Sequence, residues 1–322
     1  MGKANDQSVF GRSNKQTVGT VEAVTKQNDM PVLSLPTAGR PAAIVTLLLL
    51  IGWLILAGFP FLWTLWGSFK VEADFFSKVD WRYALDGTHT LIETGSAFTT
   101  DAYHGVLVEE SFLQPLMRTL LLVIGTVCIS LTFGTLGGYA LSRSNYRYAF
   151  LILLFALACR ALPHITLVAG YLNPLFALGL WGDLPIAIIV LVAINQPFTL
   201  WIMYAFFRGV STELDDSAML DGCSRIQAFR HVIVPLMWPG VVTAGLFSFL
   251  LAYNDFVVTA LLLDQGSQSA VPAIAAFLGT TFESGRIMYA VAAVMTITAP
   301  LVLVVLFFQR RLIAGFAMAT GK

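Results

Sequence analysis

The sequence predicts an all-α transmembrane protein with six spans, and three observations support this fold class. Hydrophobic residues make up 57% of the 322 residues and charged residues only 12%, so lipid is the expected solvent for most of the chain. Six apolar segments are each long enough to supply the roughly 20 helical residues that cross a bilayer. Lysine and arginine are concentrated in alternate connections, as expected of a chain that crosses the membrane repeatedly.

The first span is expected over residues 41–66. It follows a polar tail, residues 1–40, which shows no sustained periodicity and is expected to be disordered. This tail is too long and too polar for the short basic start of a cleavable signal peptide. An acidic external loop, residues 67–111, comes next. It is either a small cap that faces a soluble partner or a solvated connector.

The other five spans belong to one core domain, residues 112–310, and a short tail, residues 311–322, follows it. The expected span ranges are 112–141, 148–170, 184–207, 239–263 and 287–308. Before the last span, residues 271–284 form a short amphipathic stretch. This stretch is either a re-entrant or interfacial helix or an ordered loop.

The orientation follows from the basic residues, because lysines and arginines near span ends stay in the cytoplasm. The two ends of the chain and the second and fourth connections hold thirteen of them, whereas the opposite loops hold four. Both termini and the fourth connection are therefore expected in the cytoplasm. The net charge is zero and the basic residues form no stripe, which argues against a nucleic-acid partner.

The fourth connection, residues 211–240, is a long charged segment between two strongly apolar segments, and it predicts two short helices. Gly222 is placed where the first helix should stop, since glycine adopts a left-handed conformation without penalty. Two residue pairs have the spacing of a capping box, Thr212 with Asp215 and Ser224 with Gln227. The apolar residues expected on the surface of this compact segment are Leu214, Ala218, Met219 and Phe229. Such a segment is suited to dock into a groove of another protein.

Motifs for catalysis and for metal binding are missing from the sequence. Residues 315–322 come nearest to a phosphate-binding loop, but the chain ends before the required Ser or Thr. No H-E-x-x-H and no G-x-S-x-G occurs, the four histidines are dispersed, and the three cysteines lack metal-ligand spacing. The chain is therefore expected to be no enzyme and to bind neither a metal ion nor a cofactor itself.

The fourth connection carries a motif known from one family of transporters. That motif is E-A-A, a glycine four residues on, and then, after about nine residues, I-x-L-P. Here it falls on Asp216-Ser217-Ala218, Gly222 and Val232-Ile233-Val234-Pro235, with Asp replacing Glu and Ser replacing Ala. Together with G-Y-A-L-S-R at residues 138–143, it makes the chain resemble the permease subunits of type I ABC importers. The similarity covers about residues 116–322 and is strongest to the carbohydrate branch that contains the maltose-permease G subunit.

The resemblance implies a helical permease of the bacterial inner membrane that pairs with a homologous permease, two copies of a cytoplasmic ATPase and an external solute-binding protein. ATP and Mg would be held by the ATPase. The motif would form the coupling helix that sits in a cleft of the ATPase, and the C-terminal residues 309–322 resemble a tail that reaches the same interface. The residues assigned to coupling are Asp216, Ser217, Ala218, Asp221, Gly222, Phe229 and Pro235. Two alternatives stay open: Asp216 acting only on the helix dipole, and Phe229 packing in the core.

Polar residues inside spans mark candidate substrate contacts, because they are costly in lipid. These residues are Arg160 and His164 on one face of span three, Asn195 and Gln196 in span four, and Tyr253, Asn254 and Asp255 in span five. A sugar offers hydroxyls and a ring face that suit the last three. Hydrogen bonds between helices are the competing interpretation. For Arg160, an acidic substituent of the solute, an ion pair with Asp255 and snorkelling to an interface all remain open.

The function predicted from the sequence is that of a permease subunit in a binding-protein-dependent ABC importer for a sugar or sugar derivative. One alternative is an ion-coupled secondary carrier that uses Asp255, Arg160 and His164 as a relay. Such carriers often show inverted repeats, and the sequence has no convincing internal repeat. A membrane scaffold without transport is a third possibility.

Overall fold

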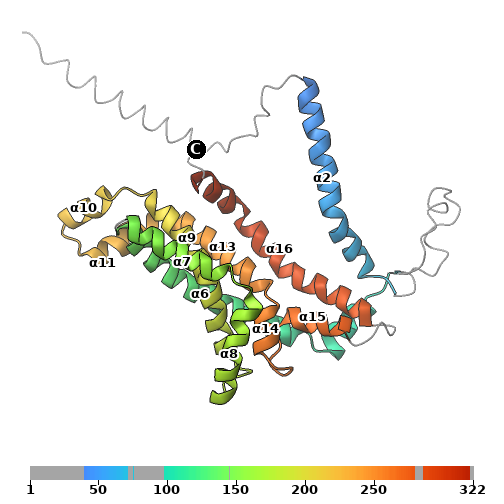
Figure 1. The fold of residues 1–322 in the computed structure, drawn as a ribbon. Helices are drawn as coiled ribbons and strands as arrows, with labels where there is room; N and C mark the ends of the chain where they lie inside the picture. The colour runs from blue at the N-terminus through green and yellow to red at the C-terminus, as the bar shows by residue number, and fades with distance from the viewer. Residues whose placement is uncertain (1–39, 72–74, 76–97, 145, 280–285, 320–322) are drawn as a thin grey trace, which may run out of the picture. The chain divides into compact units, whose positions relative to one another are not determined.

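The computed structural model describes residues 40–71, 75, 98–144, 146–279 and 286–319. The chain divides into two compact units, residues 1–63 and 64–322. Every regular element in the described residues is a helix, which confirms the predicted all-α class (Figure 1). Four of the described helices are long and apolar enough to cross a membrane. The number rises to six if two bent helix pairs, Tyr146–Arg160 with His164–Leu178 and Arg225–Leu236 with Trp238–Tyr253, are each counted as one span. The six-span prediction is compatible with this range.

Helix α2, Arg40–Gly67, supplies the described part of the first unit and matches the predicted first span. None of the side chains in its most apolar window is buried. A helix that is hydrophobic on every face and long enough to cross the bilayer is suited to lipid on all sides. The disordered tail predicted before it lies outside the described residues, apart from Arg40.

The second unit is organised around three helices that pack side by side (Figure 1). They are α6 (Leu113–Ser142), α9 (Leu184–Arg208) and α13 (Trp238–Tyr253). Helix α16, Arg286–Ala319, packs on α13. The contact between α6 and α9 is close because α6 presents small buried residues every four positions, namely Ser130, Gly134, Gly138 and Ser142. Small residues at this spacing allow two membrane helices to approach closely.

Span three is not one straight helix. Helices α7, Tyr146–Arg160, and α8, His164–Leu178, meet at an angle of 84°. Pro163 causes the break, since a proline disfavours the helical conformation of the preceding residue and lacks a donor for the helical hydrogen bond. The prediction that Arg160 and His164 share one helix face is therefore wrong. They lie on either side of the break.

Span five is also interrupted. Helix α13 ends at Tyr253, and a short helix, α14, Val257–Leu262, begins after the break. The prediction that Asn254 and Asp255 lie within the span is wrong in this respect, because both belong to the break. Helix α14 packs against α8, so the two interrupted spans are neighbours.

Short helices lie between the spans. The amphipathic stretch before the last span forms α15, Ala270–Gly279, so its helical interpretation is confirmed as far as Gly279. In the first loop, α5, Asp101–His104, and η2, Gly105–Glu109, pack on α16, where the Tyr289 hydroxyl donates to Glu109 Oε2 over 3.0 Å. The cap predicted for that loop falls mostly on residues 72–74 and 76–97, which lie outside the described residues.

Candidate functional site

The fourth connection folds into four short helices. They are α10 (Glu213–Leu220), α11 (Arg225–Ala228), η3 (Phe229–Ile233) and α12 (Val234–Leu236). Residues 211–236 are called the coupling segment below. Figure 1 shows α10 and α11 together at one end of the second unit. Gly222 has φ +89° in the turn between them, as predicted for a helix stop. The capping box of Ser224 and Gln227 is confirmed, with Ser224 N donating to Gln227 Oε1 over 2.8 Å.

The second predicted capping box, Thr212 with Asp215, is wrong. The Thr212 side chain makes no cap hydrogen bond, and the Glu213 amide donates to Ser211 Oγ over 3.2 Å instead. Asp215 turns inward to another helix. Its buried carboxylate has stronger partners there, and a buried charge is stable only when it is paired and hydrogen-bonded.

Asp215 joins α10 to the end of α6 through a set of short hydrogen bonds. The Tyr139 hydroxyl donates to Asp215 Oδ1 over 2.7 Å, and Arg143 Nε and Nη2 both lie 2.8 Å from Oδ2. Arg143 Nη1 also donates to the carbonyl oxygens of Phe207 and Val210, each over 3.2 Å, at the end of α9. Tyr139, Arg143 and Asp215 are called the Arg143 anchor below. The anchor ties the coupling segment to two spans at once.

Aromatic packing strengthens the same junction. The Tyr139 ring lies 4.7 Å from the Phe229 ring and 5.6 Å from the fully buried Phe207 ring, measured between centroids. Phe229 is half-buried and belongs to this cluster, which favours the core-packing alternative for this residue. Such aromatic pairs contribute about 0.5–1.5 kcal/mol each beyond the area that they bury. The coupling segment and the ends of α6 and α9 are therefore expected to move as one body.

The outward side of the coupling segment combines apolar and acidic side chains. Leu220 is 88% exposed and Ile226 is 77% exposed, and neither was among the predicted surface residues. Both could have been found as large apolar residues in a polar connection. The prediction that Ala218 is exposed is wrong, since only 6% of it is accessible. Other exposed side chains of the segment include Glu213, Leu214, Asp216, Ser217, Met219, Asp221 and Pro235, and the basic residues Arg225, Arg230 and His231 are exposed as well.

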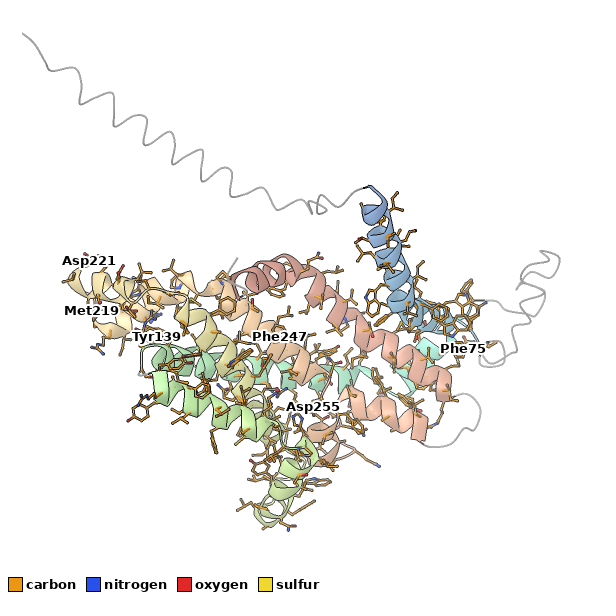
Figure 2. All side chains as sticks on the ribbon, turned by 45° about the horizontal axis from the view of Figure 1, so that its top comes forward. Phe75, Tyr139, Met219, Asp221, Phe247 and Asp255 are labelled. Carbon is orange, nitrogen blue, oxygen red and sulfur yellow. The ribbon has the colours of Figure 1, made fainter. Side chains whose placement is uncertain are left out.

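An exposed apolar patch edged by carboxylates is typical of a surface that binds another protein. Figure 2 shows Met219 and Asp221 at the tip of the second unit, with Tyr139 of the Arg143 anchor beside them. The anchor residues face the spans, and the patch faces away from them. The segment therefore has one side for fixation and one side for contact.

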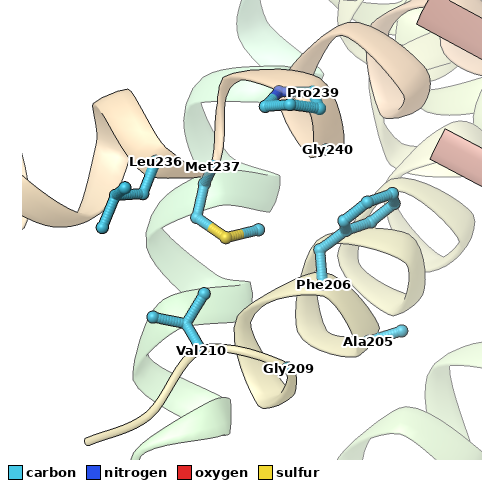
Figure 3. Close-up of a pocket in the computed structure, with 8 residues that line it drawn as sticks. All are labelled: Ala205, Phe206, Gly209, Val210, Leu236, Met237, Pro239 and Gly240. Atoms are coloured by element: carbon cyan, nitrogen blue, oxygen red, sulfur yellow. The ribbon is translucent and has the colours of Figure 1, made fainter. Parts of the chain in front are cut away.

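A crevice of about 330 Å³ lies where the coupling segment meets the spans (Figure 3). Its lining residues are Ala205, Phe206, Gly209, Val210, Leu236, Met237, Pro239 and Gly240. A Cβ atom on Gly240 would lie 2.8 Å from Phe206 Cγ, closer than real Cβ contacts come. Glycine at this position therefore lets the start of α13 lie directly against the end of α9.

The predicted substrate residues do not form one cluster. The Tyr253 hydroxyl donates to the Ile297 carbonyl of α16 over 2.6 Å, and its ring stacks on Phe249. For Tyr253 the structure therefore favours the alternative interpretation, a hydrogen bond between helices. Asn195 is buried and Gln196 half-buried in α9, where Asn195 Nδ2 and Gln196 Oε1 have no hydrogen-bond partner. The other described side chains with such unpaired buried oxygen atoms in the three central helices are Thr126, Ser130 and Ser248.

Replacement of Tyr253 by phenylalanine should lower stability slightly without changing solute affinity. The variant keeps the ring contact with Phe249 and loses only the hydrogen bond to Ile297, which in membrane proteins is worth about 0.6–1.7 kcal/mol. Thermal unfolding of the detergent-purified complex and the KM of transport check this. A raised KM with unchanged thermal stability would contradict this and would indicate that Tyr253 contacts the solute.

Four polar residues remain at the two breaks: Arg160, His164, Asn254 and Asp255. The ion pair of Arg160 with Asp255, an alternative from the sequence, is not formed. Asp255 Oδ1 instead accepts from the amides of Val258 and Thr259, over 2.9 and 3.3 Å, at the start of α14. Arg160 Nη1 donates to the Ile194 carbonyl over 3.2 Å, and its guanidinium lies 5.6 Å from the Phe198 ring centroid.

Comparison with known proteins places this geometry in a family. Residues 130–317 match the model of the binding-protein-dependent transport system inner membrane component, a range that holds the coupling segment and both broken spans. The chain is 33% identical to the trehalose transport system permease protein SugB of Mycobacterium tuberculosis over 70% of its own length and 83% of that protein. It is 30% identical to the sulfoquinovosyl glycerol transport system permease protein SmoH of Agrobacterium fabrum, over 88% and 95% of the two chains.

A solved structure has the same fold. It is the crystal structure of a bacterial ABC transporter involved in the import of the acidic polysaccharide alginate, with a TM-score of 0.64 at 20% identity. The similarity covers 87% of this chain and 99% of that one. The chain is thus a multi-pass inner-membrane permease, and the resemblance first seen in its fourth connection is confirmed. It belongs to the family of binding-protein-dependent transport system inner membrane components.

Proposed function

We propose that the chain is a permease subunit that imports a sugar or sugar derivative and couples its movement to a separate ATPase through the coupling segment. The similarity to SugB and SmoH, permease proteins of a trehalose and a sulfoquinovosyl glycerol transport system, supports a sugar-like solute. The Arg143 anchor is the observation that carries the coupling role. It fixes α10 to α6 and α9 with a buried ion pair, so a force applied to α10 is transmitted to the spans.

The working transporter contains this chain, a homologous permease, two ATPase subunits with ATP and Mg, and an external solute-binding protein. Both termini and the coupling segment face the cytoplasm, as the distribution of basic residues predicts. ATP binding would close the ATPase pair and draw the coupling segments of the two permeases together. The attached spans would then rock from inward-open to outward-open.

Six of the exposed side chains of the coupling segment would contact the ATPase, and Glu213 at the start of α10 is not among them. Leu220 and Ile226 supply apolar area, and Asp216 and Asp221 supply charged acceptors at its edge. Ser217 and Pro235 are exposed and belong to the same surface. Gly222 shapes the turn between the two helices. Ala218 and Phe229 act from within, because they pack the segment against its own spans.

The ion-coupled carrier is the weaker alternative. Its relay would pass through Arg160, His164 and Asp255, yet two backbone amides hold the Asp255 carboxylate at the start of α14. Membership of a binding-protein-dependent family also favours ATP as the energy source. Transport that survives loss of the ATPase and collapses with an uncoupler would favour the carrier.

The test is the assembly and ATP hydrolysis of the co-expressed complex in nanodiscs, comparing wild type with Leu220→Glu and Asp216→Lys. We expect Leu220→Glu to reduce ATPase co-purification at least tenfold, since it places a charge in the apolar patch of the interface. Asp216→Lys should lower hydrolysis stimulated by the binding protein, with sulfoquinovosyl glycerol as the probe solute, by a similar factor.

The matched control is Leu178→Glu, which makes the same change at a residue that is 69% exposed at the end of α8. It should leave co-purification of the ATPase unchanged. Equal loss in Leu178→Glu and Leu220→Glu would point to general misfolding. Full activity of both coupling-segment variants would contradict the proposed docking surface.

A further inference from the structure

Two spans contain a break in their helix, one between α7 and α8 and one between α13 and α14. Both breaks place non-helical backbone at a similar depth in the membrane. Helix α7 has 15 residues and α13 has 16, so both breaks lie about 22–24 Å from the cytoplasmic ends of these helices at 1.5 Å per residue. The hydrocarbon core is about 30 Å thick, so this depth is well inside it. Ala161, Leu162 and Pro163 in one break and Asn254 in the other are exposed in this chain.

Open backbone at this depth is tolerated only where protein covers it or where it lines a water-filled cavity. The packing of α8 on α14 makes the two breaks neighbours, and Figure 2 shows Asp255 away from Tyr139 of the Arg143 anchor and from Met219 and Asp221 of the coupling segment. We call residues 160–164 and 254–256 the notch. A notch with exposed polar groups in a permease is suited to the translocation pathway, where solute sites form at interrupted helices.

Arg160 gives the notch a positive charge. Its contacts are one backbone carbonyl, that of Ile194, and the ring of Phe198, and it forms no ion pair with any described carboxylate. The carboxylate of the other break, Asp255, is already bound to two amides, and His164 is a titratable neighbour of it. Two contacts leave most of the five guanidinium N–H donors of Arg160 unused.

An arginine without an opposite charge is costly at this depth. The cost falls when an anionic group enters the notch and accepts two parallel hydrogen bonds from the guanidinium. From this geometry we infer that the notch selects solutes with an anionic substituent, a carboxylate, sulfonate, sulfate or phosphate on the sugar, and that Arg160 is the residue that recognises it. The inference rests on the proposed function and adds the chemical class of the solute.

Neighbouring groups fit such a solute. The exposed Asn254 side chain donates through Nδ2 to the Leu250 carbonyl over 2.9 Å, which leaves its amide oxygen to accept from a sugar hydroxyl. The Phe198 ring holds the Arg160 guanidinium by a cation–π contact without neutralising it. The side chain is thus positioned in advance, and less conformational entropy is lost on binding.

The test measures charge selectivity at the notch without knowledge of the natural solute. In a background with Cys128, Cys159 and Cys223 replaced by alanine, Leu162→Cys places a thiol in the notch and Leu178→Cys places one at the far end of α8. The intact complex in nanodiscs is treated with anionic sulfonatoethyl and with cationic trimethylammonioethyl methanethiosulfonate. The ratio of the two rates at Leu162→Cys is divided by the ratio at Leu178→Cys.

We expect the normalised ratio to favour the anionic reagent by about fivefold to tenfold, the size of the effect of one unscreened charge several ångströms away. Arg160→Gln should remove this preference, and Arg160→Lys should retain it. Glucuronate at millimolar concentration should slow the anionic reagent at Leu162→Cys, whereas glucose should not. With Arg160→Gln, glucuronate should no longer slow it.

Three results would overturn the inference. A thiol at Leu162→Cys that neither reagent reaches would place the notch against lipid or protein. A normalised ratio near one would mean that a carboxylate of the partner permease neutralises Arg160. Equal protection by glucose and glucuronate, or protection by neither, would remove the anionic specificity. Because the intact complex is purified first, failure of the ATPase to co-purify is a separate result that contradicts the proposed function.

Discussion

Replacement of Asp215 by alanine is expected to abolish transport while the transmembrane helices stay folded. The Arg143 guanidinium would lose its carboxylate at a site where the two side chains are 16% and 12% exposed. Removal of one partner of a buried ion pair costs about 3–5 kcal/mol, and the partial exposure places this pair at the lower end. A loss of about 3 kcal/mol shifts the population of the attached coupling segment by more than a hundredfold.

The measurement is ATP-driven uptake of an anionic sugar derivative of the inferred class, with sulfoquinovosyl glycerol as the probe, into proteoliposomes, together with ATP hydrolysis by the same preparation. Arg143→Ala should match Asp215→Ala, because it removes the ion pair and both bonds to the carbonyls of Phe207 and Val210. Tyr139→Phe should have a smaller effect of about 1 kcal/mol, since it keeps the ring contacts and loses one hydrogen bond. ATP hydrolysis that continues without uptake would identify the defect as uncoupling.

Glu213→Ala is the matched control for the anchor. It removes an exposed carboxylate from the same helix, two residues from Asp215, and should leave uptake within about twofold of wild type, as expected of a surface charge. If Glu213→Ala and Asp215→Ala reduced uptake equally, transport would depend on the total acidic charge of α10, and the proposed role of the Arg143 anchor would be wrong.

The second large effect is expected at the contact between α6 and α9. A Cβ atom on Gly138 would lie 2.7 Å from Met203 Cβ and 2.9 Å from the Tyr204 backbone nitrogen. Backbone cannot rotate away, so the two helices must separate along their closest contact. Gly138→Ala should therefore destabilise the complex by about 3 kcal/mol, the upper end for an overpacked core, and should lower its yield.

Two other glycines make this prediction specific. Gly134→Ala should cost less, because its Cβ would meet the terminal Cγ2 of Thr199, a side-chain atom, at 2.7 Å. Gly170→Ala in α8 has no atom within 4 Å of the new methyl group and should be neutral or slightly stabilising. Thermal unfolding of the three detergent-purified variants gives the ranking. Equal midpoints for Gly138→Ala and Gly170→Ala would contradict close packing of α6 on α9.

Features that depend on neighbouring residues could be read from the sequence. Apolar segments longer than the membrane predicted the helices, and local hydrogen bonding predicted the Ser224 capping box. Gly222 was recognisable because a left-handed residue is needed where α10 turns into α11. The motif around Asp216 and Gly222 identified the family before any fold was known.

Features that depend on distant residues needed the tertiary structure. Asp215 and Glu213 look alike in the sequence, yet only Asp215 meets Tyr139, 76 residues earlier, because α10 folds back against the end of α6. For the same reason Ala218 is buried while Leu220 is exposed. The helical pattern through residues 148–170 did not show how sharply the chain bends at Pro163.

The candidate substrate residues divide in the same way. Their polarity inside apolar spans was visible in the sequence, but their partners were not. In the structure Tyr253 bonds to Ile297 and Asp255 to the start of α14, and Arg160 forms no ion pair with a carboxylate of the described residues. The sequence determined which residues are costly to bury in a membrane. Only the packing of the helices decided which of them are satisfied within the chain, because hydrogen bonds and ion pairs depend on distances that hydropathy does not encode.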